Sequence, residues 1–266
     1  METNLGRFPA LGEVPEPLKF AWPIVVLPEL FATSHHLAAM VGYFATIGWE
    51  VYAPDLRVTD SPLEKVDFAM LTDRAAEAIA SLGREAIVVG HGIGGLVALK
   101  LAERAGIKAA VAVAPLAPGF RTSLFMPRWN FFSAWQSLPL NPPTGRTLFD
   151  FIADADVHSR EQIIKGLIPG PTAAALEVAN GKISFANEKT APRLIIAGES
   201  DKFAPYEKLE EFARGIGAPI VKIPNRGHWL VGGRALERVI NETQRFLVRS
   251  LGRDLLLLFP EEWKND

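Results

Sequence analysis

The sequence contains no cysteine among its 266 residues. This absence excludes disulfide bonds, thiolate zinc sites, iron–sulfur clusters and a cysteine nucleophile. Any covalent catalysis therefore has to use an oxygen or nitrogen nucleophile. The five histidines show no metal-ligand spacing together with a carboxylate, so we predict neither a metal nor another cofactor.

An excess of charge of one sign is also missing. The 28 Lys and Arg residues and the 30 Asp and Glu residues leave a formal net charge of −2. Such a chain has no global field for holding nucleic acid or an anionic membrane, so we expect a small-molecule ligand. No apolar run approaches the roughly 18 residues that span a bilayer, and the first residues show no basic segment followed by an apolar one. We therefore expect a cytoplasmic protein without a membrane partner.

Short apolar runs alternate with segments of helical periodicity, as in repeated β-α-β units. Because the apolar runs show no polar face, they predict a mostly parallel sheet with helices on both faces, an α/β fold. Strands are expected at residues 24–27, 50–53, 86–90, 109–114, 193–197 and 220–223. Helices are expected at residues 34–47, 65–82, 94–104, 205–214 and 235–249. Residues 1–22 are rich in proline and predict an irregular arm with one edge strand at 18–21.

The alternation stops between residues 115 and 187, where prolines and aromatic residues gather around helical pieces near 147–155 and 159–167. We interpret residues 116–187 as an inserted cap, and residues 1–115 with 188–266 as one core domain. Open α/β sheets bind ligands beyond the carboxyl ends of their strands, so the ligand is expected between the cap and the sheet.

A glycine-rich turn joins the expected strand at 86–90 to the next helix. Its sequence, Gly90-His91-Gly92-Ile93-Gly94-Gly95, resembles the nucleophile elbow Gly-x-Ser-x-Gly of the α/β-hydrolase family. Glycines flank this turn in the family because the strand and the helix approach so closely that side chains would clash. Gly92 stands where the family has its serine.

Three further segments carry the same resemblance over most of the chain. Residues 48–57 look like the family's fourth strand and the loop after it, although Val58-Thr59 replaces the usual Gly-His pair. Residues 194–205 are similar to the family's acid strand, and residues 225–229 to its histidine loop. The resemblance implies that Asp201 is the acid and His228 the histidine, and the order 92, 201, 228 is the order of the family's triad.

Two departures affect the chemistry that the resemblance implies. Without a serine at position 92, acyl-enzyme chemistry through that position is excluded. The family's oxyanion donors would be the backbone N–H groups of Ile93 and Leu30, but the family usually has His-Gly where this chain has Pro28-Glu29. A carboxylate there would repel a developing negative charge, unless the Glu29 side chain points to solvent.

Three hypotheses remain open. In the first, Asp201 and His228 form a base dyad that acts without covalent catalysis, in proton abstraction, elimination, cyclisation or water activation, with Glu29 as a second acid or base. In the second, the chain is an inactive form of an esterase or carbon–carbon hydrolase whose serine was exchanged for Gly92. In the third, the protein binds a ligand without catalysis.

We favour the first hypothesis, because an exchange of the nucleophile alone would not explain the Pro28-Glu29 departure. The ligand is expected to be a small, partly apolar carbonyl compound. His35 and His36 are interpreted as surface residues at a helix start. Candidate ligand contacts are His91, Trp129, Phe132 and Trp229.

Overall fold

The computed structural model describes residues 1–57, 60–121, 137–186 and 191–257. Its centre is an eight-stranded sheet with the order β1-β2-β4-β3-β5-β6-β7-β8. The six strands from β4 to β8 in this order run parallel, and β1 and β2 are antiparallel. The predicted α/β fold is thereby confirmed. The strands are β1 (Glu2–Leu5), β2 (Phe8–Glu13), β3 (Ile24–Leu27), β4 (Val51–Pro54), β5 (Ala86–His91), β6 (Ile107–Val113), β7 (Arg193–Gly198) and β8 (Ile220–Ile223).

The N-terminal arm differs from its prediction. The structure places the hairpin of β1 and β2 there, and the expected strand at 18–21 contributes only an isolated bridge between Phe20 and Leu256. The hairpin joins the sheet because β2 pairs with β4, from Ala10 opposite Pro54 to Glu13 opposite Val51. In β2, buried side chains alternate with more exposed ones, as expected of a strand with one buried face.

Helices cover the sheet, and their apolar side chains face it. Those of the core are α1 (Ala38–Thr46), α2 (Phe68–Ala80), α3 (Ile93–Leu101), α8 (Tyr206–Gly215) and α9 (Leu236–Leu251). In α9 the buried side chains recur at helical spacing, which turns one stripe toward β6, β7 and β8. α2 begins where the Asp67 carboxylate accepts a hydrogen bond from the Met70 N–H at 2.8 Å. Strands β3 and β5 are buried along their whole length, in agreement with a sheet covered on both faces.

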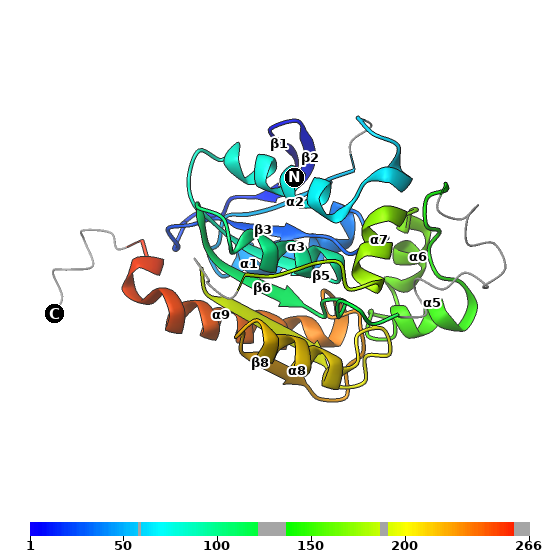
Figure 1. Ribbon diagram of the computed structural model, residues 1–266. Helices are drawn as coiled ribbons and strands as arrows, with labels where there is room; N and C mark the ends of the chain where they lie inside the picture. Colours follow the sequence, from blue (N-terminus) through cyan, green and yellow to red (C-terminus); the bar gives the residue numbers. More distant parts are fainter. Residues whose placement is uncertain (58–59, 122–136, 187–190, 258–266) are drawn as a thin grey trace, which may run out of the picture.

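Within its described residues, the segment between β6 and β7 contributes the helices α5 (Gly145–Phe151), α6 (Arg160–Gly166) and α7 (Thr172–Ala179). Figure 1 shows them together at the right-hand end of the sheet, opposite the C-terminus. α5 and α6 correspond to the expected helical pieces, whereas α7 was not expected. The division of the chain into a core and a cap of residues 116–187 stays a prediction.

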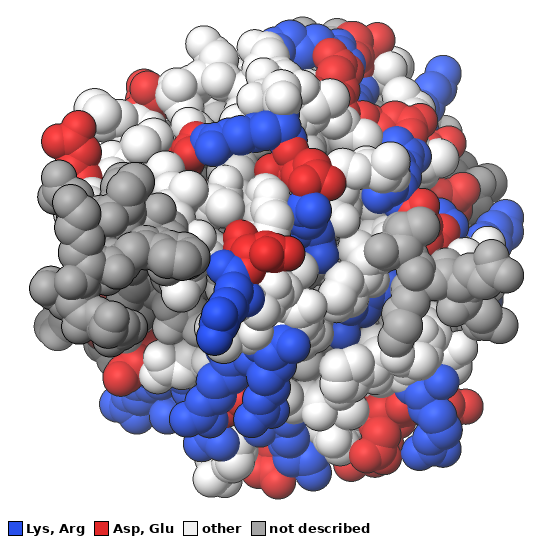
Figure 2. All heavy atoms as spheres, turned by 90° about the vertical axis from the view of Figure 1, so that its left-hand side faces the viewer, with Lys and Arg blue, Asp and Glu red and all other residues white. Residues whose placement is uncertain are grey.

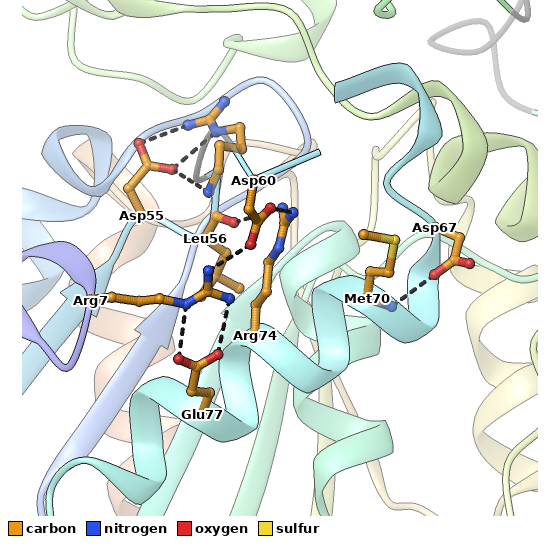
Figure 3. A network of polar contacts seen from close by, with 9 residues as sticks. Arg7, Asp55, Leu56, Asp60, Asp67, Met70, Arg74 and Glu77 are labelled. Carbon is orange, nitrogen blue, oxygen red and sulfur yellow. Dashed lines mark hydrogen bonds and ion pairs between the residues drawn. The ribbon is translucent and has the colours of Figure 1, made fainter. Parts of the chain in front are cut away.

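A chain of ion pairs fixes the segment that follows β4 (Figure 3). Asp60 pairs with Arg74 of α2, and it accepts a hydrogen bond from Arg7 at 2.6 Å. Arg7 also donates two hydrogen bonds to Glu77, at 2.9 and 3.0 Å. Arg74 is almost fully buried and donates to the Leu56 carbonyl at 3.2 Å. Because a buried guanidinium is stable only when its charge is compensated, the network holds the β1–β2 turn, the segment after β4 and α2 in one arrangement.

Charges of both signs are interspersed on the face shown in Figure 2, apart from a group of basic side chains near its lower edge. In the part of the chain that the structure describes, no helix is long and apolar enough to cross a membrane. The same described residues contain no group of three or more potential metal ligands.

Candidate active site

The glycine-rich turn leads from β5 directly into α3. Gly92 has φ 54° and ψ −118°, a left-handed region that glycine enters without a steric penalty. The helix packs so closely against the loop after β3 that a Cβ on Gly94 would lie 2.5 Å from the Pro28 carbonyl oxygen. β5 and α3 therefore meet in a tight turn with Gly92 at its apex, at the carboxyl end of β5.

Glu29 occupies the space above Gly92. A Cβ built on Gly92 would overlap the Glu29 carboxylate, so these two residues are sterically matched. Glu29 is 2% exposed, so of the two orientations left open by the sequence its side chain does not take the one that points to solvent. The segment after β3 turns the side chain inward, where one carboxylate oxygen, Oε2, accepts a hydrogen bond from the Ile93 N–H at 2.8 Å.

Glu29 thus interacts with both of the backbone groups that the resemblance implies as oxyanion donors. Burial raises the pKa of Glu29, while His228 and the N–H groups of Ile93 and Leu30 oppose this rise only in part. In this conformation the Ile93 N–H donates to a protein carboxylate and is not free to bind the oxygen of a substrate.

Asp201 and His228 form a buried pair. The Nδ1 atom of His228 lies 2.8 Å from Oδ2 of Asp201. The other carboxylate oxygen, Oδ1, accepts hydrogen bonds from the N–H groups of Phe203 and Ala204, which fix the carboxylate in the turn after β7. Burial alone lowers the pKa of His228, but Asp201, and to a smaller extent Glu29, outweigh this effect and raise it overall. The pair can therefore stabilise an imidazolium.

Two buried polar atoms at the centre of the site have no hydrogen-bond partner among the described residues. They are Nε2 of His228 and Oε1 of Glu29, and they lie 4.0 Å apart. Unpaired buried polar atoms cost stability, and such strain is typical of functional sites. A polar atom of a ligand placed between the two would be able to interact with both.

His91 stabilises the loop that carries His228. Its Nε2 atom donates to the His228 carbonyl oxygen at 2.9 Å. Burial, and then the neighbouring charge of His228, lowers the pKa of His91 to about 3. The neutral ring thus donates to the loop that carries His228, and the ligand contact of His91 stays a prediction.

The remaining sequence candidates have different positions. Trp229 is buried and lies edge-on to His91, with ring centroids 5.6 Å apart. Trp129 and Phe132 lie outside the described residues. His36 is not a simple surface residue, because its ring accepts from the Thr33 N–H and lies 3.1 Å from the Ile163 carbonyl oxygen of α6. A cavity of about 500 Å³ borders His36 and Trp229, between the histidine loop and α6.

Sequence reasoning missed two aromatic residues that contact the His228 ring and a third that contacts one of these two. Phe31, Phe151 and Phe203 are buried, and Phe151 and Phe203 lie against the His228 ring. The signal for Phe31 and Phe203 was their position two residues after Glu29 and Asp201. Phe151 has no such signal, because it comes from the segment between β6 and β7.

The family model described as "Alpha/beta hydrolase family" matches residues 20–242. The chain belongs to the α/β-hydrolase family. No curated protein matches it. Among solved structures, a thermophilic esterase from Thermogutta terrifontis superposes with a TM-score of 0.68 at 18% identity, covering 91% of this chain and 94% of the esterase.

Two further α/β structures show the same fold at low identity. A monoacylglycerol lipase from Paleococcus ferrophilus has a TM-score of 0.66 at 18% identity, over 87% of this chain and 97% of the lipase. An E-2-(acetamidomethylene)succinate hydrolase has a TM-score of 0.68 at 18% identity, over 93% of this chain and 98% of the hydrolase. At such identities the likeness shows the fold alone.

The low pKa of His91 predicts how the stability of this α/β-hydrolase depends on pH. Below pH 6.5 the unfolded chain protonates this histidine, whereas the folded protein does not until about pH 3. The free energy of unfolding should therefore fall as the pH drops through this range, by about 1.4 kcal/mol per pH unit from this residue. Urea unfolding between pH 6.5 and 4 should show a shallower dependence in His91→Asn than in the wild type.

His158→Asn, which alters an exposed histidine, is the control and should keep the wild-type dependence. The lowered pKa of His36 acts in the same direction in all three proteins and cancels in the comparison. An identical pH dependence in the wild type and in His91→Asn would contradict the buried, neutral state of His91.

Proposed function

We propose that this α/β-hydrolase binds a small, partly apolar carbonyl compound and transfers a proton without a covalent intermediate. His228 is the base, Glu29 is the acid, and Asp201 positions His228. The observation that carries the proposal is the pair of unpartnered buried atoms, Nε2 of His228 and Oε1 of Glu29, 4.0 Å apart.

The electrostatics assign the two roles. Burial raises the pKa of Glu29, which favours a neutral carboxyl group able to donate a proton to a carbonyl oxygen. Asp201 favours the imidazolium form of His228, so Nε2 can accept a proton from the carbon next to that carbonyl group. The products of this step are an enol, a Glu29 carboxylate and a His228 imidazolium, and the reverse transfers restore the site.

The Ile93 N–H, which the resemblance implies as an oxyanion donor, has a different role in this scheme. As Glu29 loses its proton, the charge develops on its own carboxylate, to which the Ile93 N–H already donates at 2.8 Å. A preorganised donor needs no reorganisation when this charge appears. The site thus stabilises an anion on the protein instead of an anion on an acyl group.

The overlap at Gly92 supports this proposal over that of an inactivated serine hydrolase. A serine side chain at position 92 would collide with Glu29. Replacing Gly92 alone by serine would therefore not give a working nucleophile elbow. The binding-protein alternative is favoured by one observation, the complete burial of the His228 ring.

Exchange of protons for deuterium next to the carbonyl group tests the proposal. Small ketones and aldehydes incubated in D₂O with the wild-type protein should exchange these protons faster than buffer alone, as measured by NMR. His228→Ala and Glu29→Gln should each lose about 10²- to 10⁴-fold of the catalysed rate, the usual contribution of general acid–base catalysis. Binding should change by only a few-fold, because the loss is in the transition state.

Glu207→Gln makes the same substitution at an exposed position and should behave as the wild type. Exchange that survives in His228→Ala would place the chemistry elsewhere. Tight binding of a carbonyl compound with no exchange in any compound tested would favour the binding-protein alternative.

A further inference from the structure

One side chain of α5 enters the site described above. Phe151 is the only residue of this helix that is buried, and its exposed fraction is 0%. Phe149, two positions earlier on the same helix, is 64% exposed. α5 therefore directs a single phenyl ring into the interior.

Among the described residues, four rings lie against Phe151, and each comes from a loop that carries a site residue or from the site itself. The ring centroids lie 5.3 Å from His228, 5.5 Å from Trp229, 6.0 Å from Phe203 and 6.2 Å from Phe31. We call Phe31, Phe203, His228 and Trp229 the aromatic box. The box includes the His228 ring itself, and Phe151 fills the space between its members.

The filling of the box controls access to the reactive atoms. Neither Nε2 of His228 nor Oε1 of Glu29 is exposed, so a ligand reaches them only if a neighbouring group gives way. Most of the surroundings are strands and the loops that directly follow them, which are fixed by the sheet. Phe151 belongs instead to a seven-residue helix, and four of its neighbours are aromatic rings that would pack equally well against another ring.

We propose that Phe151 is a specificity-determining residue. In the free protein its ring occupies the position that an aromatic ring of the substrate takes when it binds. This inference rests on the proposed function and names its substrate class, a carbonyl compound that carries an aryl group. The aryl ring lies in the aromatic box, and the carbonyl group attached to it reaches the space between Nε2 of His228 and Oε1 of Glu29. Edge-to-face contacts with the box replace those that Phe151 makes in the free protein.

Acetophenone, the simplest aryl methyl ketone, is a suitable probe for Phe151→Ala. This variant should bind acetophenone at least about tenfold more tightly than the wild type, because the emptied apolar space accepts a ring of the same size. Binding should also shift the NMR signals of the His228 ring. Phe149→Ala, on the same helix but exposed, should bind as the wild type does. Acetone, which has the carbonyl group without the ring, should show no gain in Phe151→Ala.

Benzene, which has the ring without the carbonyl group, distinguishes a subsite from a simple void. Adding His228→Ala to Phe151→Ala should weaken the binding of acetophenone while leaving that of benzene unchanged. If the second change leaves both affinities unchanged, or if Phe151→Ala binds acetophenone no better than the wild type, the inference is overturned. Should Phe151→Ala fail to fold, Phe151→Leu replaces it, with a smaller gain for acetophenone expected and the same outcomes deciding.

The experiment separates this inference from the proposed function. Acetophenone that binds Phe151→Ala with a shift of the His228 signals, yet shows no exchange of its methyl protons for deuterium, would leave the aryl site standing and overturn proton transfer. The opposite result is His228-dependent proton exchange in other carbonyl compounds, with no gain in acetophenone binding in Phe151→Ala. It would support proton transfer and overturn the aryl site.

Discussion

Serine at position 92 together with glycine at position 29 should turn this protein into a hydrolase of activated esters. The double variant Gly92→Ser/Glu29→Gly removes the carboxylate that overlaps a Cβ at position 92 and frees the Ile93 N–H for an oxyanion. The serine hydroxyl would then lie next to His228, whose Nδ1 atom is already held by Asp201 at 2.8 Å. Nucleophile, base and oxyanion donor would all be present.

The rate of hydrolysis of p-nitrophenyl acetate measures the effect. An initial burst of the first product would indicate an acyl-enzyme intermediate. The double variant should exceed the wild type by at least about 10²-fold, since a single oxyanion donor alone contributes about 10² to 10³. Gly92→Ser alone should gain little and should lower the free energy of unfolding by about 1–3 kcal/mol, the usual cost of overpacking. Glu29→Gly alone is the control without a nucleophile. Full activity in Gly92→Ser alone would show that Glu29 moves aside, and it would favour the inactivated-hydrolase alternative.

The second large effect is expected from Asp201→Asn. Oδ1 of Asp201 accepts from the N–H groups of Phe203 and Ala204, and an asparagine carbonyl oxygen can keep these two hydrogen bonds. The amide NH₂ group would then face Nδ1 of His228 and donate to it. This reverses the tautomer of the ring, places the proton on Nε2 and removes the charge that raises the pKa of His228.

Proton exchange catalysed by Asp201→Asn should therefore fall by about 10³- to 10⁴-fold, similar to the effect of the corresponding change in a serine protease. Nitrogen NMR of the His228 ring should show the proton on Nε2 and a lowered pKa, a change that loss of packing alone would not cause. Asp201→Ala, which also loses both hydrogen bonds to the turn, should be less stable than Asp201→Asn. A ring with the wild-type tautomer and pKa in Asp201→Asn would refute the positioning role of Asp201.

The sequence was most informative where the local backbone imposes a residue type. The glycines around position 92 follow from the close approach of β5 and α3, and the fully buried strands β3 and β5 require unbroken apolar runs. These local requirements predicted the parallel sheet and the elbow. The hairpin of β1 and β2 was missed because its pairing with β4 is remote in the chain and its strands contain proline and glycine.

The sequence by itself determined the α/β fold, the absence of a nucleophile at Gly92 and the order of the elbow, Asp201 and His228. Only the tertiary structure decided that Glu29 points inward to Ile93, 64 positions away in the chain, and that Phe151 lies against His228. The physical reason is that the direction of a loop side chain depends on the space left by distant segments. Gly92 leaves room for a carboxylate at the elbow, and the aromatic box leaves room for one ring.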